Sequence, residues 1–250
     1  MASTAIQPRW NSSTRTPTQT LVLEEVLRRV GEAVLRRPEP PPVVTFDLDS
    51  TVFDNRPRQL AILSAFARAK GLTGAEELDF TAIDGWRVAV FAARLGGAAG
   101  REAELKAEFK SFWRDRFFTS EHCLFDHPLP GAGAFVQEVE TRGAIVVYLT
   151  GRHEAMREGT VQSLHGGGFP GGTLVMKPTF EMTDTQWKEI AVAKIRELGE
   201  VVACFDNETT HVNRLWAAFP DAYVVWLCTD HSPEAEPLPD GTPHIEGFLR

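Results

Sequence analysis

The second half of the sequence alternates between short apolar runs and longer amphipathic segments, and this alternation limits the fold more than any other feature. Apolar runs of strand length lie at 144–150, 173–178, 201–207 and 222–227, and segments with helical spacing of their apolar residues separate them. An earlier run, VVTFDLD at 43–49, has the same character. Such alternation predicts an α/β fold, a mostly parallel sheet covered by helices and joined by right-handed crossovers.

A stretch of different texture, residues 56–125, interrupts this pattern and predicts helices only. Its clearest helix, in the segment 101–118, has large apolar residues at helical spacing: Leu105, Phe109, Phe112, Trp113 and Phe117. We therefore divide the chain into a polar N-terminal tail and helix (1–40), a Rossmann-like three-layer core (41–55 and 126–250) and an inserted all-helical cap (56–125). Within the first unit, the helix is expected at 21–36, before Pro38.

Charge and cysteine content limit the partners and the compartment. The chain has 26 Lys and Arg against 34 Asp and Glu, a net charge of −8, which argues against general binding to nucleic acid or to anionic lipid. Its three cysteines are widely spaced without a CxxC pair, which disfavours a disulfide framework or a cysteine zinc site. Without an apolar run of membrane-spanning length or a secretory signal, we expect a cytoplasmic protein that does not bind membranes.

Polar residues follow four of the predicted strands, where the carboxyl ends of parallel strands form one rim and bind ligands. They are Asp47, Asp49 and Thr51 after the first, Thr150, Gly151 and Arg152 after the second, Lys177 after the third, with Lys188 on the next helix, and Asp206, Asn207 and Glu208 after the fourth. Three carboxylates that converge on one rim are costly unless something pairs them. Mg²⁺ would do so because it prefers oxygen ligands, so the sequence predicts a magnesium site.

The segment DLDST at 47–51 resembles the DxDx(T/V) signature of the haloacid dehalogenase superfamily of phosphatases. The resemblance extends over about 42–54 and 126–228, where all four motifs follow in order, and the helical cap lies between the first and the second. It implies that Asp47 is the nucleophile, which forms an aspartyl-phosphate, and that Asp49 is the general acid. Thr150 with the amide after it would bind phosphate oxygens. Asp206 would hold Mg²⁺ together with Asp47 and the main-chain carbonyl of Asp49.

The lysine of the third motif is either Lys177 or Lys188. The interval of 18 residues between Lys188 and Asp206 is similar to the spacing in the polynucleotide-kinase-type and nucleotidase branches of the family, so we expect Lys188. The fourth motif departs from the family pattern, because many members carry a second acid where this chain has Thr210. Asn207 or Glu208 would then take its place in the outer sphere of the metal.

The expected activity is hydrolysis of a small phosphorylated metabolite or nucleotide, which a helical lid would enclose. The predicted substrate-binding residues are Thr51, Gly151, Arg152 and Arg56, and a hypothesis adds Asn55 and Arg58, near the start of the lid, for the part of the substrate beyond the phosphate. A phosphoryl-transfer mutase uses the same residues and stays possible. A phospho-accepting signalling receiver is a further alternative, although such modules are about half this length and have no cap. Asp49 argues against halide displacement, which needs no proton donor.

Overall fold

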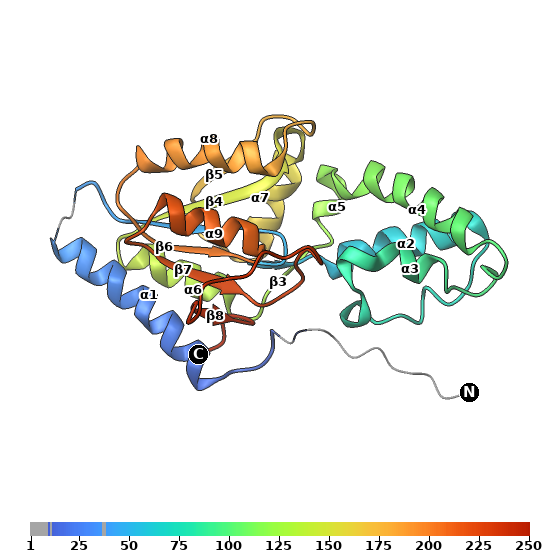
Figure 1. Ribbon diagram of the computed structural model, residues 1–250, viewed down its shortest axis with the longest axis horizontal. Coiled ribbons are helices and arrows are strands. Elements are labelled where there is room, and N and C mark those ends of the chain that lie inside the picture. The colour runs from blue at the N-terminus through green and yellow to red at the C-terminus, as the bar shows by residue number, and fades with distance from the viewer. Residues whose placement is uncertain (1–9, 11, 37–38) are drawn as a thin grey trace.

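A six-stranded parallel sheet forms the centre of the molecule. The computed structural model describes residues 10, 12–36 and 39–250 (Figure 1). The strands follow the order β5-β4-β1-β6-β7-β8, and every neighbouring pair is parallel. Their bounds are β1 Val43–Phe46, β4 Ile145–His153, β5 Thr173–Lys177, β6 Val201–Asp206, β7 Tyr223–Leu227 and β8 His244–Ile245. The predicted α/β class with a mostly parallel sheet is confirmed.

Helices cover both faces of this sheet, so its strands are buried on both sides. On one face, α1 (Pro17–Arg36) and α6 (Ala132–Thr141) pack against strand residues that include Val44, Phe46, Val146, Tyr148 and Phe205. On the other face, α8 (Asp184–Arg196) and α9 (Thr209–Ala218) pack against Val43, Val147, Leu149, Cys204 and Val224. The two sets alternate along each strand because successive side chains point to opposite faces of a sheet. The near-continuous apolar runs of the sequence are therefore explained by burial on both sides.

A group of helices lies to one side of the sheet (Figure 1). It comprises α2 (Arg56–Lys70), two 3₁₀ turns, η1 (Phe80–Ala82) and η2 (Gly85–Arg87), α3 (Val88–Ala92), α4 (Glu102–Phe117) and α5 (Ser120–Cys123). These elements lie within the interval in which the sequence predicts an all-helical cap. Most of them share a hydrophobic core of their own, built on residues such as Ile62, Phe66, Leu105 and Phe109. We refer to residues 56–125 as the cap.

A short antiparallel strand pair joins the cap to the sheet. The two strands, β2 (Phe53–Asp54) and β3 (His127–Pro128), pair with Asp54 opposite His127. The chain leaves the core through β2 and returns through β3, so the two connections of the cap lie side by side. Strands of two residues carry no alternation that a sequence pattern could reveal.

Several boundaries differ from those that the sequence predicts. The first helix begins at Pro17 and not at 21, because Pro17 takes the first helical position, where proline needs no hydrogen-bond donor, and the Thr16 hydroxyl accepts a bond from Gln19 N–H. The strand expected at 144–150 continues to His153, and the following helix, α7 (Arg157–Gly166), starts after a 3₁₀ turn, η3 (Glu154–Met156). Part of the predicted N-terminal tail, 1–9 and 11, lies outside the described residues. Among the described helices, none combines the length and the apolar character that crossing a bilayer requires.

Candidate active site

The predicted site residues gather at the carboxyl edge of the sheet, around the central strand β1. Phe46 lies in register with Phe205 of β6 and with Tyr148 of β4, so Asp47 emerges at the level of Asp206 and Leu149. The main-chain N–H of Asp47 donates to Phe205 O at 2.9 Å, which ties the end of β1 to β6. The parallel register therefore brings together motifs that lie more than 150 residues apart in the sequence.

The turn that follows Asp47 is tightly wound. Leu48 O accepts the N–H groups of Thr51, Val52 and Phe53 at 3.2, 3.1 and 3.0 Å. Ser50 has a φ of 58°, in the left-handed region that residues other than glycine rarely adopt. The Thr229 hydroxyl donates to Ser50 O and helps to hold this conformation. Such strained turns concentrate at functional sites, where the surrounding structure maintains them.

Lys188 joins the two carboxylates that the sequence assigns to the nucleophile and the metal site. Its Nζ lies 3.2 Å from Asp47 Oδ1 and 2.5 Å from Asp206 Oδ2, and all three side chains are almost fully buried. Burial opposes the ammonium, but Asp206 and Asp47 raise the pKa of Lys188 above its ordinary value, so it stays charged. Lys177, the other candidate for the motif lysine, ends β5 and lines the neighbouring cavity.

The two carboxyl groups differ in their ionisation. Burial raises the pKa of Asp47 to about 8, which Lys188 partly opposes and Asp206 reinforces. For Asp206, burial is outweighed by Lys188 and His211, so its pKa lies well below the usual range. Asp206 Oδ1 also accepts the Glu208 N–H at 3.0 Å. Asp206 is therefore the more acidic of the two groups, and at Asp47 the charge of Lys188 opposes the effect of burial.

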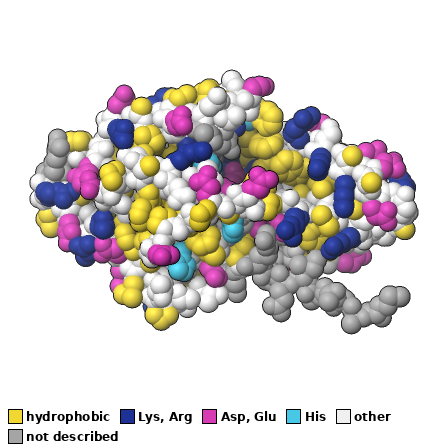
Figure 2. Space-filling model, viewed as in Figure 1, with side chains coloured by type: hydrophobic (Ala, Val, Ile, Leu, Met, Phe, Trp, Pro, Cys, Tyr) yellow, Lys and Arg dark blue, Asp and Glu magenta, His cyan; other side chains and the backbone are white. Residues whose placement is uncertain are grey.

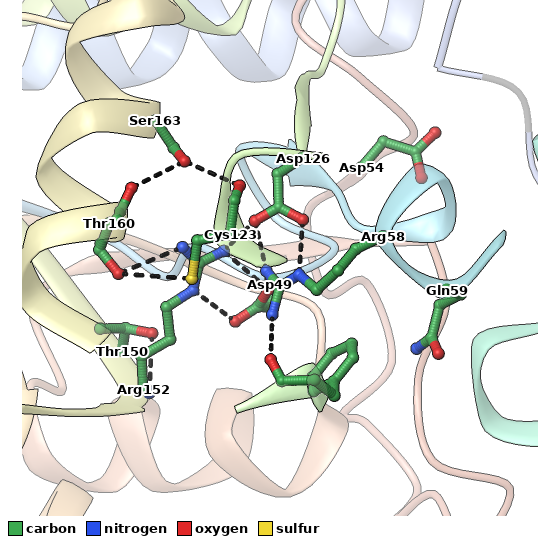
Figure 3. Close-up of polar contacts among 12 residues, drawn as sticks. Asp49, Asp54, Arg58, Gln59, Cys123, Asp126, Thr150, Arg152, Thr160 and Ser163 are labelled. Atoms are coloured by element: carbon green, nitrogen blue, oxygen red, sulfur yellow. Dashed lines mark hydrogen bonds and ion pairs between the residues drawn. The ribbon is translucent and has the colours of Figure 1, made fainter. Parts of the chain in front are cut away.

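Asp49 belongs to a separate network of buried charges (Figure 3). Arg152 donates to both of its carboxylate oxygens, at 2.8 and 2.9 Å, and Arg58 Nη2 donates to Oδ1 at 2.7 Å. Both guanidinium groups also bond to Asp126, whose side chain is fully buried, as is that of Arg58. Burial alone would raise the pKa of Asp49, but Arg152 and Arg58 hold it well below its ordinary value.

Asn55 completes the surroundings of Asp49. It is the residue before α2, a position where an asparagine side chain commonly caps the helix, yet it makes no capping bond. Its side chain instead hydrogen-bonds to Asp49. The residue that directly precedes the cap therefore hydrogen-bonds to the predicted general acid.

Thr150 and Gly151 line the same cavity as Asp47 and Asp49. The Thr150 hydroxyl accepts the Arg152 N–H at 3.2 Å, and Thr150 O accepts the indole N–H of Trp187 at 2.9 Å. The fully buried Trp187 lies next to Lys188 on α8, so one helix supports both Thr150 and the lysine. The extension of β4 past Thr150 aims Arg152 at Asp49.

The side chains of Asn207 and Glu208, in the fourth motif, bond to other segments of the chain. Asn207 accepts from Thr51 Oγ1 at 3.3 Å, and its amide donates to Asp230 O. Thr51 Oγ1 also lies 3.2 Å from Asp47 Oδ2, so Thr51 and Asn207 connect the first motif with the fourth. The carboxylate of Glu208 accepts the Ser232 N–H at 3.0 and 3.1 Å.

Arg56 lies apart from the other predicted site residues. Its guanidinium bonds to both carboxylate oxygens of Asp54 and stacks on Trp10, with Cζ 3.7 Å from the ring centroid. The described lining of the cavity does not include Arg56. The geometry favours a structural role for it, at the junction between the strand pair and the cap, and contact with substrate stays a prediction.

A cavity of about 400 Å³ lies over these groups, between the core and the cap. Asp47, Asp49, Thr150 and Arg152 line it from the core, and Gln59 lines it together with aromatic residues of the cap. Its volume is within the range of about 300–1,000 Å³ that is typical of small-molecule sites. The carboxylates therefore face a space in which a substrate can bind.

A metal site can be tested against the donors that the structure provides. No cluster of three or more His, Cys, Asp or Glu side chains suited to a metal occurs within residues 10, 12–36 and 39–250. Two carboxylates suffice for Mg²⁺, which commonly uses one or two together with water and phosphate oxygens. Because Asp47 and Asp206 both contact Lys188 Nζ, their nearer oxygens lie within 6 Å of each other. The number and the chemical type of these donors, two carboxylates at one edge of the sheet, fit a magnesium ion.

Two solved structures share the α/β architecture of this chain at a TM-score of 0.50 or more. A candidate phosphatase from Clostridium difficile superimposes with a TM-score of 0.52 at 12% identity, over 77% of this chain and 88% of that one. Protein Tyrosine Kinase A from Mycobacterium tuberculosis gives 0.50 at 17% identity, over 81% and 93%. A hydrolase of the haloacid dehalogenase-like family from Streptococcus pneumoniae gives 0.47 at 11% identity, over 74% and 83%.

The chain shares the α/β fold of the first two of these structures. No family model matches its sequence, and no curated protein matches it. One structural neighbour is named as a phosphatase and another as a kinase, so the shared fold does not by itself fix the reaction. The side chains of the site, and not the fold, determine which reaction the protein can catalyse.

The sequence does not single out Asp126, and it assigns Arg58 a different role. No sequence motif surrounds Asp126. Its hydrogen bond with Arg152 depends on the path by which the chain leaves the cap. Arg58 is expected to contact the substrate, whereas the structure commits its guanidinium to Asp49, Asp126 and Phe117 O. The sequence feature that pointed to Arg58 as a site residue is its position near the start of the cap.

Proposed function

We propose that this chain is a Mg²⁺-dependent phosphomonoester hydrolase that acts through an aspartyl-phosphate intermediate on Asp47. The observation that carries the proposal is the pair of buried ion clusters at one cavity: Lys188 between Asp47 and Asp206, and Asp49 beside Arg152. Chemistry at phosphorus needs a nucleophile, a proton donor and fixed positive charge. Asp47 would be the nucleophile and Asp49 the proton donor, and Lys188 and Arg152 would supply the fixed positive charge.

In the first half-reaction, a carboxylate oxygen of Asp47 attacks phosphorus and the bond from phosphorus to the substrate alcohol breaks. Asp49, two residues along the turn, gives its proton to the departing oxygen. Lys188 and the Thr150–Gly151 segment offset the negative charge on the transferring group. Mg²⁺, held by Asp47, Asp206 and the main-chain carbonyl of Asp49, would shield the repulsion between nucleophile and phosphate.

In the second half-reaction, Asp49 accepts a proton from a water molecule whose oxygen attacks phosphorus. The bond between phosphorus and the Asp47 oxygen breaks, inorganic phosphate leaves, and both aspartates return to their starting states. Asp49 therefore has to carry a proton when the first step occurs. Its arginine partners keep it ionised at rest, and a phosphate dianion that binds beside it would raise its pKa.

The test uses p-nitrophenyl phosphate with the full-length protein. We expect turnover in the presence of Mg²⁺, its loss when EDTA is added, and its loss in Asp47→Asn. The exposed Asp240, which lies outside the cavity, provides the matched control, and Asp240→Asn should behave as wild type. Turnover that persists in Asp47→Asn or in EDTA would contradict the proposal. Phosphorylation by acetyl phosphate without any turnover would favour a signalling receiver instead.

A further inference from the structure

The cavity over the candidate site has an aromatic wall. Four of its residues come from the cap, Trp86, Trp113, Phe117 and Phe118, and one from the loop between β5 and α8, Phe180. Trp113 stacks on Phe117 with ring centroids 4.5 Å apart, and Phe118 meets both rings edge-on. Phe118 also contacts Phe180, at 4.9 Å, so the wall extends across the boundary between cap and core.

Two of these rings are strongly exposed for their size. Trp86 is 54% exposed and Phe180 41%, whereas Phe66 and Phe109 in the core of the cap are fully buried. Figure 2 shows hydrophobic side chains gathered along the boundary between the sheet and the cap. Exposed aromatic surface that lines a cavity is typical of a ligand-binding site, because binding removes it from water.

The wall begins one side chain away from the predicted proton donor. Arg58 Nη2 bonds to Asp49 Oδ1 at 2.7 Å, and the Arg58 Cζ lies 4.4 Å from the centroid of the Phe117 ring. The oxygen that leaves phosphorus must lie next to Asp49 to receive its proton. The part of the substrate attached to that oxygen therefore extends towards the aromatic wall.

Three polar atoms converge at one position beside the wall. A β-carbon placed on Gly85 would lie 3.1 Å from Asp230 Oδ2, 3.5 Å from Gln59 Nε2 and 3.8 Å from Asn55 Oδ1. The indole N–H of Trp113 donates to Gln59 Oε1, so the amide is oriented with its Nε2–H groups available to donate at this position. The absence of a side chain at Gly85 keeps one donor and two acceptors close together.

The charges of the cavity disfavour an anionic group in this position. Among the described lining residues, the lysine and arginine side chains are Lys177 and Arg152, and Arg152 is bound to Asp49 and Asp126. Asp230 would repel a carboxylate or a second phosphate. A neutral, flat group with hydrogen-bonding atoms at its edge matches the wall, the donor and the acceptors.

We propose that the aromatic wall binds the leaving group of the substrate, and that this leaving group carries a planar heteroaromatic ring, as in a nucleoside monophosphate. The proposal rests on the proposed phosphatase function and narrows its substrate class. Stacking on the exposed rings supplies affinity, and Gln59, Asn55 and Asp230 contact the polar edge of the bound group. Small aliphatic phosphates and phosphates of carboxylic acids are poor substrates in this view.

The first test compares substrates that differ only in the ring. Uridine and adenosine 5′-monophosphate share with ribose 5-phosphate the same primary phosphate on a ribose. We expect kcat/KM for at least one nucleotide to exceed that for ribose 5-phosphate by about 5- to 150-fold, the range that stacking of one base on an aromatic side chain provides. Equal or better turnover of ribose 5-phosphate would overturn the proposal.

The second test removes the rings. Trp86→Ala and Phe180→Ala should raise KM for the preferred nucleotide by at least about 5-fold, with a smaller change in kcat, and should reduce the preference over ribose 5-phosphate. Trp86→Phe keeps an aromatic face and should recover most of the preference. Trp216→Ala is the matched control, because Trp216 is 38% exposed on α9 and does not line the cavity. Equal losses on both substrates would contradict the proposal.

A binding measurement separates this proposal from the phosphatase function. In Asp47→Asn, which cannot form the covalent intermediate, quenching of tryptophan fluorescence by each nucleotide and by ribose 5-phosphate reports binding without turnover. Tighter binding of a nucleotide, in a protein whose wild type hydrolyses no phosphomonoester, would keep the assignment of the wall and reject the hydrolase. Hydrolysis of aliphatic phosphates without a nucleotide preference in binding would support the hydrolase and reject the assignment of the wall.

Discussion

Lys188 is the residue on which the charge balance of the candidate site depends. Its single positive charge lies between two buried carboxyl groups, those of Asp47 and Asp206. We expect Lys188→Met to reduce kcat for p-nitrophenyl phosphate by about 100-fold or more, the usual effect of removing one group that stabilises transition-state charge. Steady-state kinetics at saturating Mg²⁺ measures this. Lys194→Met, on the exposed side of the same helix, is the control, and a loss of less than about threefold in Lys188→Met would contradict the role assigned here.

Asp47 provides a prediction on pH. Burial raises its pKa to about 8, so below that pH the binding of Mg²⁺ would have to displace a proton from the Asp47 carboxyl group. Metal affinity should therefore increase as the pH rises from 6 to 8, by at most about tenfold per unit, and level off above 8. Calorimetric titration with Mg²⁺ in two buffers of different ionisation enthalpy measures both the affinity and the proton released. An affinity independent of pH over this range, without proton release, would show that Asp47 is already ionised.

Residues of the candidate site differ in how far the sequence could reveal them. Asp47, Asp49, Thr150 and Asp206 follow apolar runs, and the carboxyl ends of parallel strands always form one rim. The interval between Lys188 and Asp206 resembles a spacing found in the family and predicts Lys188 as the motif lysine, and the structure places it between Asp47 and Asp206. Asp126 could not be found in this way, because its contacts depend on the path of a loop and not on a local pattern. The catalytic roles of all these residues stay predictions.

At the scale of elements, the contact between α5 and α7 depends on a glycine. A β-carbon on Gly159 of α7 would lie 1.9 Å from Ser120 O at the start of α5, a distance that no structure can accommodate. We expect Gly159→Ala to destabilise the protein by at least about 1–3 kcal/mol, the usual cost of overpacking. Urea unfolding at constant m-value measures the change.

The same helix offers the control. A β-carbon on Gly166, the last residue of α7, would have no atom within 4 Å. Gly166→Ala should leave the stability unchanged or increase it by up to about 1 kcal/mol, because alanine loses less backbone entropy in a helix than glycine does. If both substitutions changed the free energy of unfolding by the same amount, the close approach of α5 and α7 would be contradicted.

Elements with a strong pattern were predictable, and elements held by their neighbours were not. Strands β1, β4, β5, β6 and β7 are apolar because both faces of each are covered, and their sequences show it. The pair β2–β3 and the edge strand β8 have two residues per strand, too few for any periodicity. The extension of β4 to His153, which aims Arg152 at Asp49, also left no local signal because Gly151 and Arg152 favour no strand.

At the scale of the whole molecule, one charge cluster connects the cap with the core. Arg58 belongs to α2 of the cap, Asp126 to the return connection, and Arg152 to β4 of the core. Loss of the Asp126 carboxylate would leave two buried guanidinium groups with Asp49 as their only carboxylate partner among the described residues.

Asp126→Ala should therefore lower the free energy of unfolding by about 3–5 kcal/mol, as expected when one partner of a buried ion pair is removed. It should also lower kcat measured on the protein that remains folded, because Asp49 loses its alignment. Asp115→Ala, an exposed carboxylate of α4, is the control and should change stability by less than about 0.5 kcal/mol. Urea denaturation and kinetics on the folded fraction measure the two effects. A change in stability in Asp126→Ala as small as in the control would contradict the stabilising role of this charge cluster.

The paired strands β2 and β3 have a consequence for engineering. Residues opposite each other in an antiparallel pair lie about 4.5–5.5 Å apart, a gap that a short hairpin turn can close. The segment between Asp54 and His127 could thus be exchanged for another lid whose two ends lie equally close together, provided that Arg58 and Asp126 are kept as partners of Asp49 and Arg152. Such a core would serve as a scaffold onto which lids of different selectivity are grafted.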